Sequence, residues 1–168
     1  AGNFISVDDV LQEIDADSLK FLMLNSKNDT TLVIDFEEAK NQSKDNPVFY
    51  VQYAHARCCS LMRKFDSLGL LKKESLEFDA KSVSEYEYNT HERELIKLIH
   101  AFTRTVVSAA DSFEPIKLIN YLIDIASKFH SLWNLNGYYF VDDEIDILSQ
   151  EIRILIVKGV LNAIGQAL

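Results

Sequence analysis

The chain has 168 residues and a formal net charge of −9. This charge disfavours a non-specific nucleic-acid binder, which is usually basic overall, and would confine any RNA binding to a locally basic face. Hydrophobic residues make up 48% of the chain, enough for one helical domain and a short appendage, and the scarcity of Pro and Gly disfavours an all-β fold. No apolar run approaches the roughly 20 residues that span a bilayer.

The first third of the chain predicts short helices. Ser6 and Asp9 form a capping-box pattern for a helix that ends near Ile14, and Asp15 or Asp17 begins a second helix. Because each helix is short, these elements form an appendage rather than a core of their own.

A connector follows. Residues 28–29 (Asn-Asp) are a turn signal, and the β-prone run at 31–34 has no partner strand, so we expect it to be extended. Asp35 then caps a helix over residues 36–42, which ends before Pro47.

Residues 46–67 predict one long central helix. Asn46 is a good N-cap, Pro47 suits the first helical position, and Gly69 offers a left-handed stop. At about 100° per residue the helix has two separate faces. The residues of the predicted core face are Val48, Val51, His55, Cys58, Met62 and Phe65. The residues of the second face are Tyr50, Tyr53, Arg57, Ser60 and Lys64.

The second face combines aromatic rings, on which bases can stack, with cations that can bind phosphate. A simpler interpretation stands beside this one. Tyrosines that flank a core are common on amphipathic helices, and the two cations can form a solvated edge. The pattern alone favours the simpler interpretation.

After the central helix the sequence predicts a polar loop over residues 70–89 and then a helix capped by Thr90. That helix continues through Ala110 with one apolar side. Its predicted core residues are Leu95, Leu98, Ile99 and Phe102.

Two further helices complete an all-α helical bundle. Pro115 starts one that reaches Asn134, residues 136–137 form a turn, and Asp142 or Asp143 begins the last. The predicted inward residues of the first are Ile119, Leu122, Ile123, Ala126, Phe129 and Trp133. Those of the second are Ile145, Leu148, Ile152, Leu155, Ile156, Val160 and Ile164.

The segment NPVFYVQYAHAR at residues 46–57 resembles the signature helix of bacterial arginyl-tRNA synthetases, which lies in their DALR anticodon-binding domain. The likeness extends to AGN (1–3), DADSLKFLML (15–24), DFEEAKNQS (35–43), KFHSLWN (128–134) and the final helix with Gly159. It implies that residues 1–35 are a linker or stem segment behind a catalytic domain absent from this sequence. Residues 36–168 are then a DALR-type helical anticodon-binding domain.

The resemblance implies recognition of the anticodon of tRNA(Arg). The parent enzyme, a class I arginine–tRNA ligase, would attach arginine to this tRNA using ATP with Mg²⁺. We find no HIGH- or KMSK-type loop in the chain, so we expect this fragment to have no catalytic residue, cofactor or metal of its own. The resemblance further implies a cytoplasmic monomer with no membrane partner.

Carried over to this sequence, the anticodon-facing residues are Tyr50, Tyr53, Arg57, Lys64 and Trp133. His55 matches the signature motif, but we expect it on the core face with a structural hydrogen bond. His130 is either a polar contact at the RNA face or a half-buried ring, and its apolar neighbours favour the second.

Two other functions are compatible with parts of the sequence. A helical protein-interaction module without RNA binding would suit the acidic charge. A small metal-dependent enzyme would use His55 and Cys59, which at i, i+4 supply half a zinc site, but no second Cys or His pair has metal spacing. Cys58 and Cys59 point about 100° apart on a helix, which favours two reduced thiols.

Overall fold

The computed structural model describes residues 6–27, 30–31, 33–41, 43, 45–71, 80–142 and 144–167. Throughout this described part the regular structure is helical, and it contains no strand. The helices are α1 (Val7–Glu13), α2 (Ala16–Leu24), α3 (Phe36–Lys40), α4 (Pro47–Ser67), α5 (Ala80–Glu85), α6 (Thr90–Ser112), α7 (Ile116–Trp133) and α8 (Ile147–Ala167). The predicted all-α class is confirmed.

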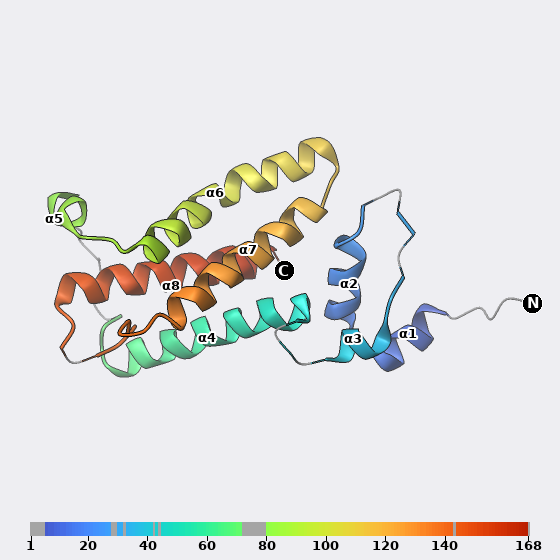
Figure 1. Cartoon of the computed structure of the whole chain (residues 1–168), viewed down its shortest axis with the longest axis horizontal. Coiled ribbons are helices and arrows are strands. Elements are labelled where there is room, and N and C mark those ends of the chain that lie inside the picture. Colours follow the sequence, from blue (N-terminus) through green and yellow to red (C-terminus); the bar gives the residue numbers. More distant parts are fainter. Residues whose placement is uncertain are drawn as a thin grey trace, which may run out of the picture.

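The four long helices form the bundle. α7 and α8 pack against each other, and α4 and α6 each pack against both of them, from opposite sides (Figure 1). The short helices α1 to α3 lie at one end of the bundle (Figure 1). α2 packs on α4 and α7, and its Phe21 belongs to the common core. The predicted domain boundary at residue 35 stays a prediction.

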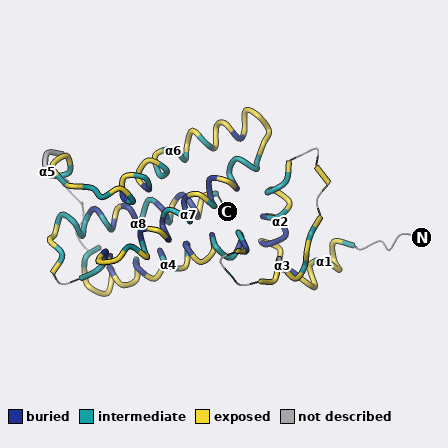
Figure 2. Tube along the Cα trace, viewed as in Figure 1, coloured by how far each residue is buried: buried dark blue, intermediate teal, exposed yellow. Residues whose placement is uncertain are grey.

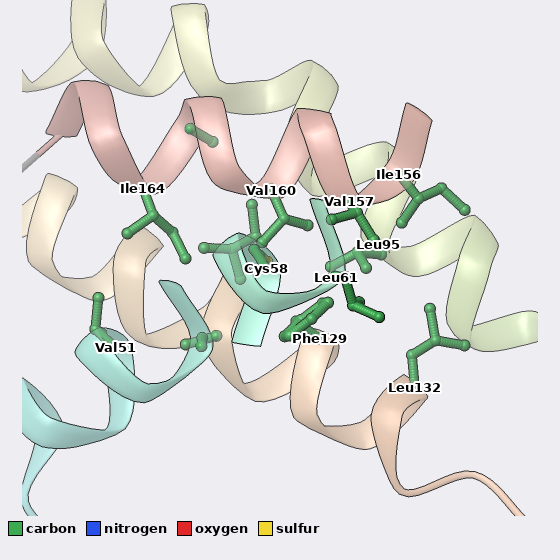
Figure 3. Packing of buried hydrophobic residues seen from close by; sticks show 14 of the residues in the cluster. Val51, Cys58, Leu61, Leu95, Phe129, Leu132, Ile156, Val157, Val160 and Ile164 are labelled. Carbon is green, nitrogen blue, oxygen red and sulfur yellow. The ribbon is translucent and has the colours of Figure 1, made fainter. Parts of the chain in front are cut away.

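The core lies between the four long helices, where buried positions of each helix face inward (Figure 2). Residues from all four helices meet in it, among them Val51, Cys58, Leu95, Phe129, Val157 and Val160 (Figure 3). α8 has buried residues around most of its circumference because it contacts three other helices. The prediction of Leu155 as a core residue is wrong: it is 41% exposed because it lies outside the arc of α8 that the buried residues occupy, whereas its neighbour Ile154 lies inside that arc and is buried.

Gly159 marks the close approach of α8 to α6. A Cβ added at Gly159 would lie 2.8 Å from Cδ1 and 3.0 Å from Cγ2 of Ile99. The absence of a side chain therefore lets the two helices pack at this distance.

The predicted start and end of α4 are confirmed. The Asn46 side chain accepts hydrogen bonds from the backbone N–H groups of Val48 (3.0 Å) and Phe49 (3.5 Å), and Pro47 occupies the first turn. The buried Asn46 amide also donates to two carbonyls near the end of α3. Gly69 follows the helix with a φ of +74°, a left-handed conformation that glycine adopts without a steric cost.

The predicted core face of α4 is partly wrong. His55 and Met62 are only half-buried, whereas Ala54 and Leu61, which were not predicted, are buried. α4 packs against both α7 and α8, so its buried face is wider than a single stripe and is centred nearer to Ala54. The His55 imidazole contacts the Cys59 thiol, with Nδ1 and Sγ 3.8 Å apart.

Other details of the predicted helices are also wrong. α6 is capped by Asn89, whose side chain accepts from Glu92 N–H, and not by Thr90. α5 lies inside the predicted loop. α8 begins several residues later than predicted, because Asp146 is the carboxylate that accepts the hydrogen bond from the N–H of Ser149. The predicted helix over residues 36–42 ends at residue 40, and the predicted turn at 28–29 lies outside the described residues.

Candidate nucleic-acid interface

α4 presents its predicted second face to α7. The ring of Tyr50 lies 4.5 Å from the ring of His130 on α7, and the ring of Tyr53 lies 5.6 Å from it (centroid distances). Tyr50 is half-buried, and Tyr53 is 43% exposed. The tyrosines therefore lie between the core and the solvent.

Arg57 lies between two aromatic rings. Its guanidinium carbon is 4.3 Å from the centroid of Tyr53 and 4.5 Å from that of Trp133, close enough for cation–π attraction to both. Phe49 stacks on Tyr53 with the rings 7° from parallel and 5.9 Å apart. Phe49, Tyr53, Arg57 and Trp133 thus form a continuous row from α4 to α7, which we call the aromatic–arginine row.

His130 lies beneath this row and is only 5% exposed. Its Nδ1 is 2.9 Å from Nη1 of Arg57, and its Nε2 is 3.1 Å from the carbonyl oxygen of Tyr50. A guanidinium has donors only, so Nδ1 must accept from Arg57. The ring is then the neutral tautomer whose Nε2–H donates to the Tyr50 carbonyl.

The surroundings of His130 favour this neutral form. Burial lowers the pKa of His130, and the nearby charge of Arg57 lowers it further, while the hydrogen bond to Tyr50 acts in the opposite direction. The prediction of a half-buried ring is wrong, because His130 is fully packed between α4 and α7. His130 also contacts Tyr50, Tyr53 and Arg57 on the predicted second face of α4. The prediction of a half-buried ring did not include these contacts.

Lys64 lies apart from the row, exposed in the last turn of α4. Together with Trp133, it lines a groove of about 340 Å³ beside the loop that follows α7. Tyr138, Tyr139 and Phe140 of that loop line the same groove. The groove therefore combines a cation with aromatic rings, next to the aromatic–arginine row.

The charge of α4 is opposite to that of the chain. The helix has three cations, Arg57, Arg63 and Lys64, and one carboxylate, Asp66, whereas the chain has a net charge of −9. The predicted basic pair at residues 72–73 lies outside the described residues. This local excess of positive charge suits an anionic ligand at this face of α4.

The structure brings four of the predicted site residues into one connected set: Tyr50, Tyr53, Arg57 and Trp133. The fifth, Lys64, lies at the edge of the adjoining groove. Sequence reasoning missed Phe49 and the burial of His130. The spacing of Phe49 and Tyr53, i and i+4 on one helix, was the available signal for the first of these.

The structure gives little support to a metal-dependent enzyme. Within the residues that the structure describes, no group of three or more His, Cys, Asp or Glu side chains is arranged to hold a metal ion. Both cysteines are free thiols, and burial raises the pKa of Cys58. None of the described helices is both long and apolar enough to cross a membrane.

Comparison of the sequence with known proteins finds similarity to the arginine–tRNA ligases and their DALR domain. The family model for the DALR anticodon binding domain matches residues 51–168. The arginine–tRNA ligase of Rickettsia bellii (strain OSU 85-389) is 36% identical over 181 residues, which cover 99% of this chain and 29% of that protein. That of Ehrlichia chaffeensis is 37% identical over 173 residues, covering 100% of this chain and 28% of the relative.

Solved structures share the fold. A Campylobacter jejuni structure described as an arginyl-tRNA synthetase matches with a TM-score of 0.73 and 25% identity over 99% of this chain and 35% of its own. Thermus thermophilus arginyl-tRNA synthetase matches with a TM-score of 0.71 and 22% identity over 98% of this chain and 26% of its own. The chain spans less than a third of the length of the two relatives named above. From the family match, which covers most of its residues, the chain belongs to the DALR anticodon binding domain family.

Proposed function

We propose that this chain binds the anticodon loop of tRNA(Arg) as part of an arginyl-tRNA synthetase. Membership of the DALR family and the names of the relatives support this function over a protein-interaction module without RNA binding. The observation that carries the proposal is the aromatic–arginine row, which includes the partly exposed Tyr53 and runs from the basic helix α4 to α7.

The row supplies the two kinds of contact that single-stranded RNA requires. Anticodon bases are unstacked in part and can lie on aromatic rings or on a guanidinium plane. Tyr53 and Trp133 offer the rings, and Arg57, whose guanidinium lies between them, offers N–H donors at its edge. Lys64, at the edge of the groove, is positioned for a phosphate of the same loop.

The chain spans less than a third of the length of these relatives, so we propose catalysis for the whole protein only. There, ATP with Mg²⁺ would activate arginine in a catalytic part outside this chain. We further propose a cytoplasmic, monomeric enzyme. The contribution of this chain would be recognition, since none of its site residues forms a nucleophile–base pair or a metal centre.

The test uses the 168-residue chain and a fluorescein-labelled RNA hairpin with a seven-nucleotide loop that contains an arginine anticodon. Binding is followed by fluorescence anisotropy, with three further hairpins that each change one anticodon base. We expect the parent chain to bind the arginine hairpin more tightly than the altered hairpins. Arg57→Ala should weaken this binding or remove the difference.

Arg104→Ala is the matched control, because Arg104 is an exposed arginine on α6, and α4 and α6 lie on opposite sides of the α7–α8 pair. It removes the same charge and should leave the difference between hairpins unchanged. Equal binding of all four hairpins by the parent chain would contradict the proposed function.

A further inference from the structure

His130 is a buried polar side chain that makes none of the proposed contacts with RNA. It lies against the proposed interface without being part of the exposed face, since it is only 5% exposed. Its two ring nitrogens are both engaged, one with Arg57 and one with the backbone of Tyr50. It therefore links α7 to the charged group of α4.

We infer that His130 is a positioning residue: its buried imidazole holds the Arg57 guanidinium in one orientation, so that the remaining N–H groups of Arg57 discriminate among anticodon bases. This inference rests on the proposed function and adds a mechanism for its specificity. It assigns to Arg57 a base edge as the partner, where the alternative partner is a phosphate.

The geometry around Arg57 restricts its side chain in each direction. Tyr53 and Trp133 contact the guanidinium at 4.3 and 4.5 Å, which fixes its plane. The bond from Nη1 to His130 (2.9 Å) and the bond from Nη2 to the Tyr53 hydroxyl (3.1 Å) fix its rotation within that plane. An arginine held in this way has lost its side-chain freedom before the RNA arrives, so binding costs less conformational entropy.

The fixed guanidinium still has donors to offer. Arginine has five N–H groups, and the hydrogen bonds to His130 and Tyr53 use one at Nη1 and one at Nη2. The remaining donors lie in one plane, a geometry that matches two acceptors on a base edge. A lysine such as the exposed Lys64 binds a phosphate as a point charge and needs no fixed plane, whereas the fixed plane of Arg57 adds the directional selectivity that base recognition requires.

His130 is also well matched to this task because its neutral ring accepts without adding charge. The titratable side chains that contact the ring are Arg57, Tyr50 and Tyr53 of α4, and its aromatic neighbour on α7, Phe129, does not titrate. Protonation of Nδ1 would remove the acceptor and place two cations together. Arg57 would then lose its fixed orientation.

The experiment compares His130→Leu and His130→Gln in the hairpin-binding assay. The quantity measured is the ratio of Kd values for altered and native anticodon hairpins, which cancels changes in general charge attraction. For a well-placed arginine at a base edge this ratio is about tenfold or more in the parent chain. We expect His130→Leu to lower the ratio close to that of Arg57→Ala, and His130→Gln, which retains one acceptor and one donor, to restore most of it.

His55→Leu is the matched control, because His55 is the half-buried histidine of α4 whose Nε2 lies near Gly165 on α8, away from the row. It should leave the ratio unchanged. A folded His130→Leu chain with the parent ratio overturns the inference. Arg57→Ala with unchanged binding and unchanged ratio instead removes Arg57 from the interface, and so contradicts the proposed function itself.

If His130→Leu does not fold, the parent chain is measured between pH 7.5 and 5, with the protonation of His130 followed by NMR. The ratio should fall as His130 becomes protonated, and Arg57→Ala should show no such fall. A ratio that stays constant while His130 becomes protonated overturns the inference.

Discussion

In the part of the chain that the structure describes, two arginines lie over tyrosine rings, and they differ in what surrounds them. Arg57 lies over Tyr53 on the outer side of α4 and is linked to a neutral buried histidine. Arg153 of α8 lies 4.4 Å from the ring centroid of Tyr138 and donates to the carbonyl of Tyr139. Tyr138 in turn donates to Glu92, a carboxylate that is only 1% exposed.

Glu92, at the centre of a polar cluster, has hydrogen-bond partners from this chain at both of its carboxylate oxygens. Its carboxylate accepts from the hydroxyls of Tyr138 (2.8 Å) and Tyr86 (3.2 Å) and from the backbone N–H of Asn89 (2.9 Å). These bonds tie the loop after α7 to the start of α6. Every polar group at the Glu92 carboxylate has a partner from this chain, so the cluster serves stability.

The aromatic–arginine row differs, because Arg57 contacts a neutral histidine and aromatic rings and, within the described residues, no carboxylate. The comparison shows that the role of a stacked arginine depends on the side chains in its hydrogen-bond network, which are His130 for Arg57 and, through Tyr138, Glu92 for Arg153. Tyr138, the ring below Arg153, donates to a buried carboxylate, so an opposite charge lies in the same network, whereas the neutral histidine bonded to Arg57 orients that arginine without adding a negative charge.

The largest expected effect is on stability, from Glu92→Ala. The substitution leaves the buried Tyr138 hydroxyl without its acceptor and removes the α6 capping box, so we expect a loss of about 3 kcal/mol in the free energy of unfolding. Urea denaturation followed by circular dichroism measures it. Glu94→Ala is the control: its solvent-exposed ion pair with Lys128 is screened by water and should contribute little to stability. Similar losses in the two variants would show that the cluster is not a stabilising unit.

The second largest effect is expected on RNA binding at the aromatic–arginine row. Tyr53→Ala removes one stacking ring and should weaken binding of the arginine hairpin by about 1–3 kcal/mol. Tyr53→Phe keeps the ring and removes only the hydroxyl that accepts from Arg57, so its affinity should stay much closer to that of the parent. Anisotropy titrations at fixed salt give both values. An equal loss in the two variants would mean that the hydroxyl, and not the ring surface, makes the contact.

The two regions should also respond to opposite ends of the pH scale. Burial lowers the pKa of His130 below its usual 6.5, so the unfolded chain takes up a proton first, and stability falls as the pH drops below about 6.5. Burial and the charge of Glu92 raise the pKa of Tyr138 above its usual 10. The unfolded chain then releases that proton first, and stability falls as the pH rises above about 10.

Thermal unfolding across this range measures both losses. His130→Gln should reduce the acidic loss and leave the alkaline loss, and Tyr138→Phe should do the reverse. The same acidic loss in His130→Gln as in the parent would assign it to other groups.

The smallest effect is expected at the edge of the groove. Lys64→Ala should lower the slope of log K against log salt by about 0.7, the value for one phosphate contact on a single strand. It should leave the ratio between native and altered hairpins unchanged, in contrast to Arg57→Ala. A changed ratio with an unchanged slope would place Lys64 at a base.

The helices that the sequence predicts best are those with local signals. Asn46, Pro47 and Gly69 define α4 through capping and turn chemistry within a few residues, and the structure confirms these assignments. The α5 helix and the late start of α8 were not predicted. For α8, four acidic residues between 142 and 146 are all favourable near a helix N-terminus, so the sequence alone does not select one. In the structure Asp146 precedes the helix and accepts hydrogen bonds from the N–H and the hydroxyl of Ser149.

For the candidate site, too, the sequence predicted only what the spacing along one helix determines. A helical wheel could group Tyr50, Tyr53 and Arg57, because they lie on one helix. It could not place Trp133 over Arg57 or His130 beneath it, since those contacts join residues more than 70 positions apart and depend on how α7 packs on α4. Resemblance to a family suggested Trp133 as a candidate, and only the packing shows that it completes the row.

The sequence contains one tryptophan, Trp133, and it lies in the proposed interface. Its intrinsic fluorescence therefore reports on the site without any label. Titration with the arginine anticodon hairpin should quench this fluorescence to saturation, with the same Kd as the anisotropy assay, because bound bases lie in or beside its groove. A hairpin with the same stem and a stable four-nucleotide loop should have little effect. Binding seen by anisotropy with unchanged Trp133 fluorescence would place the RNA elsewhere and contradict this account of the interface.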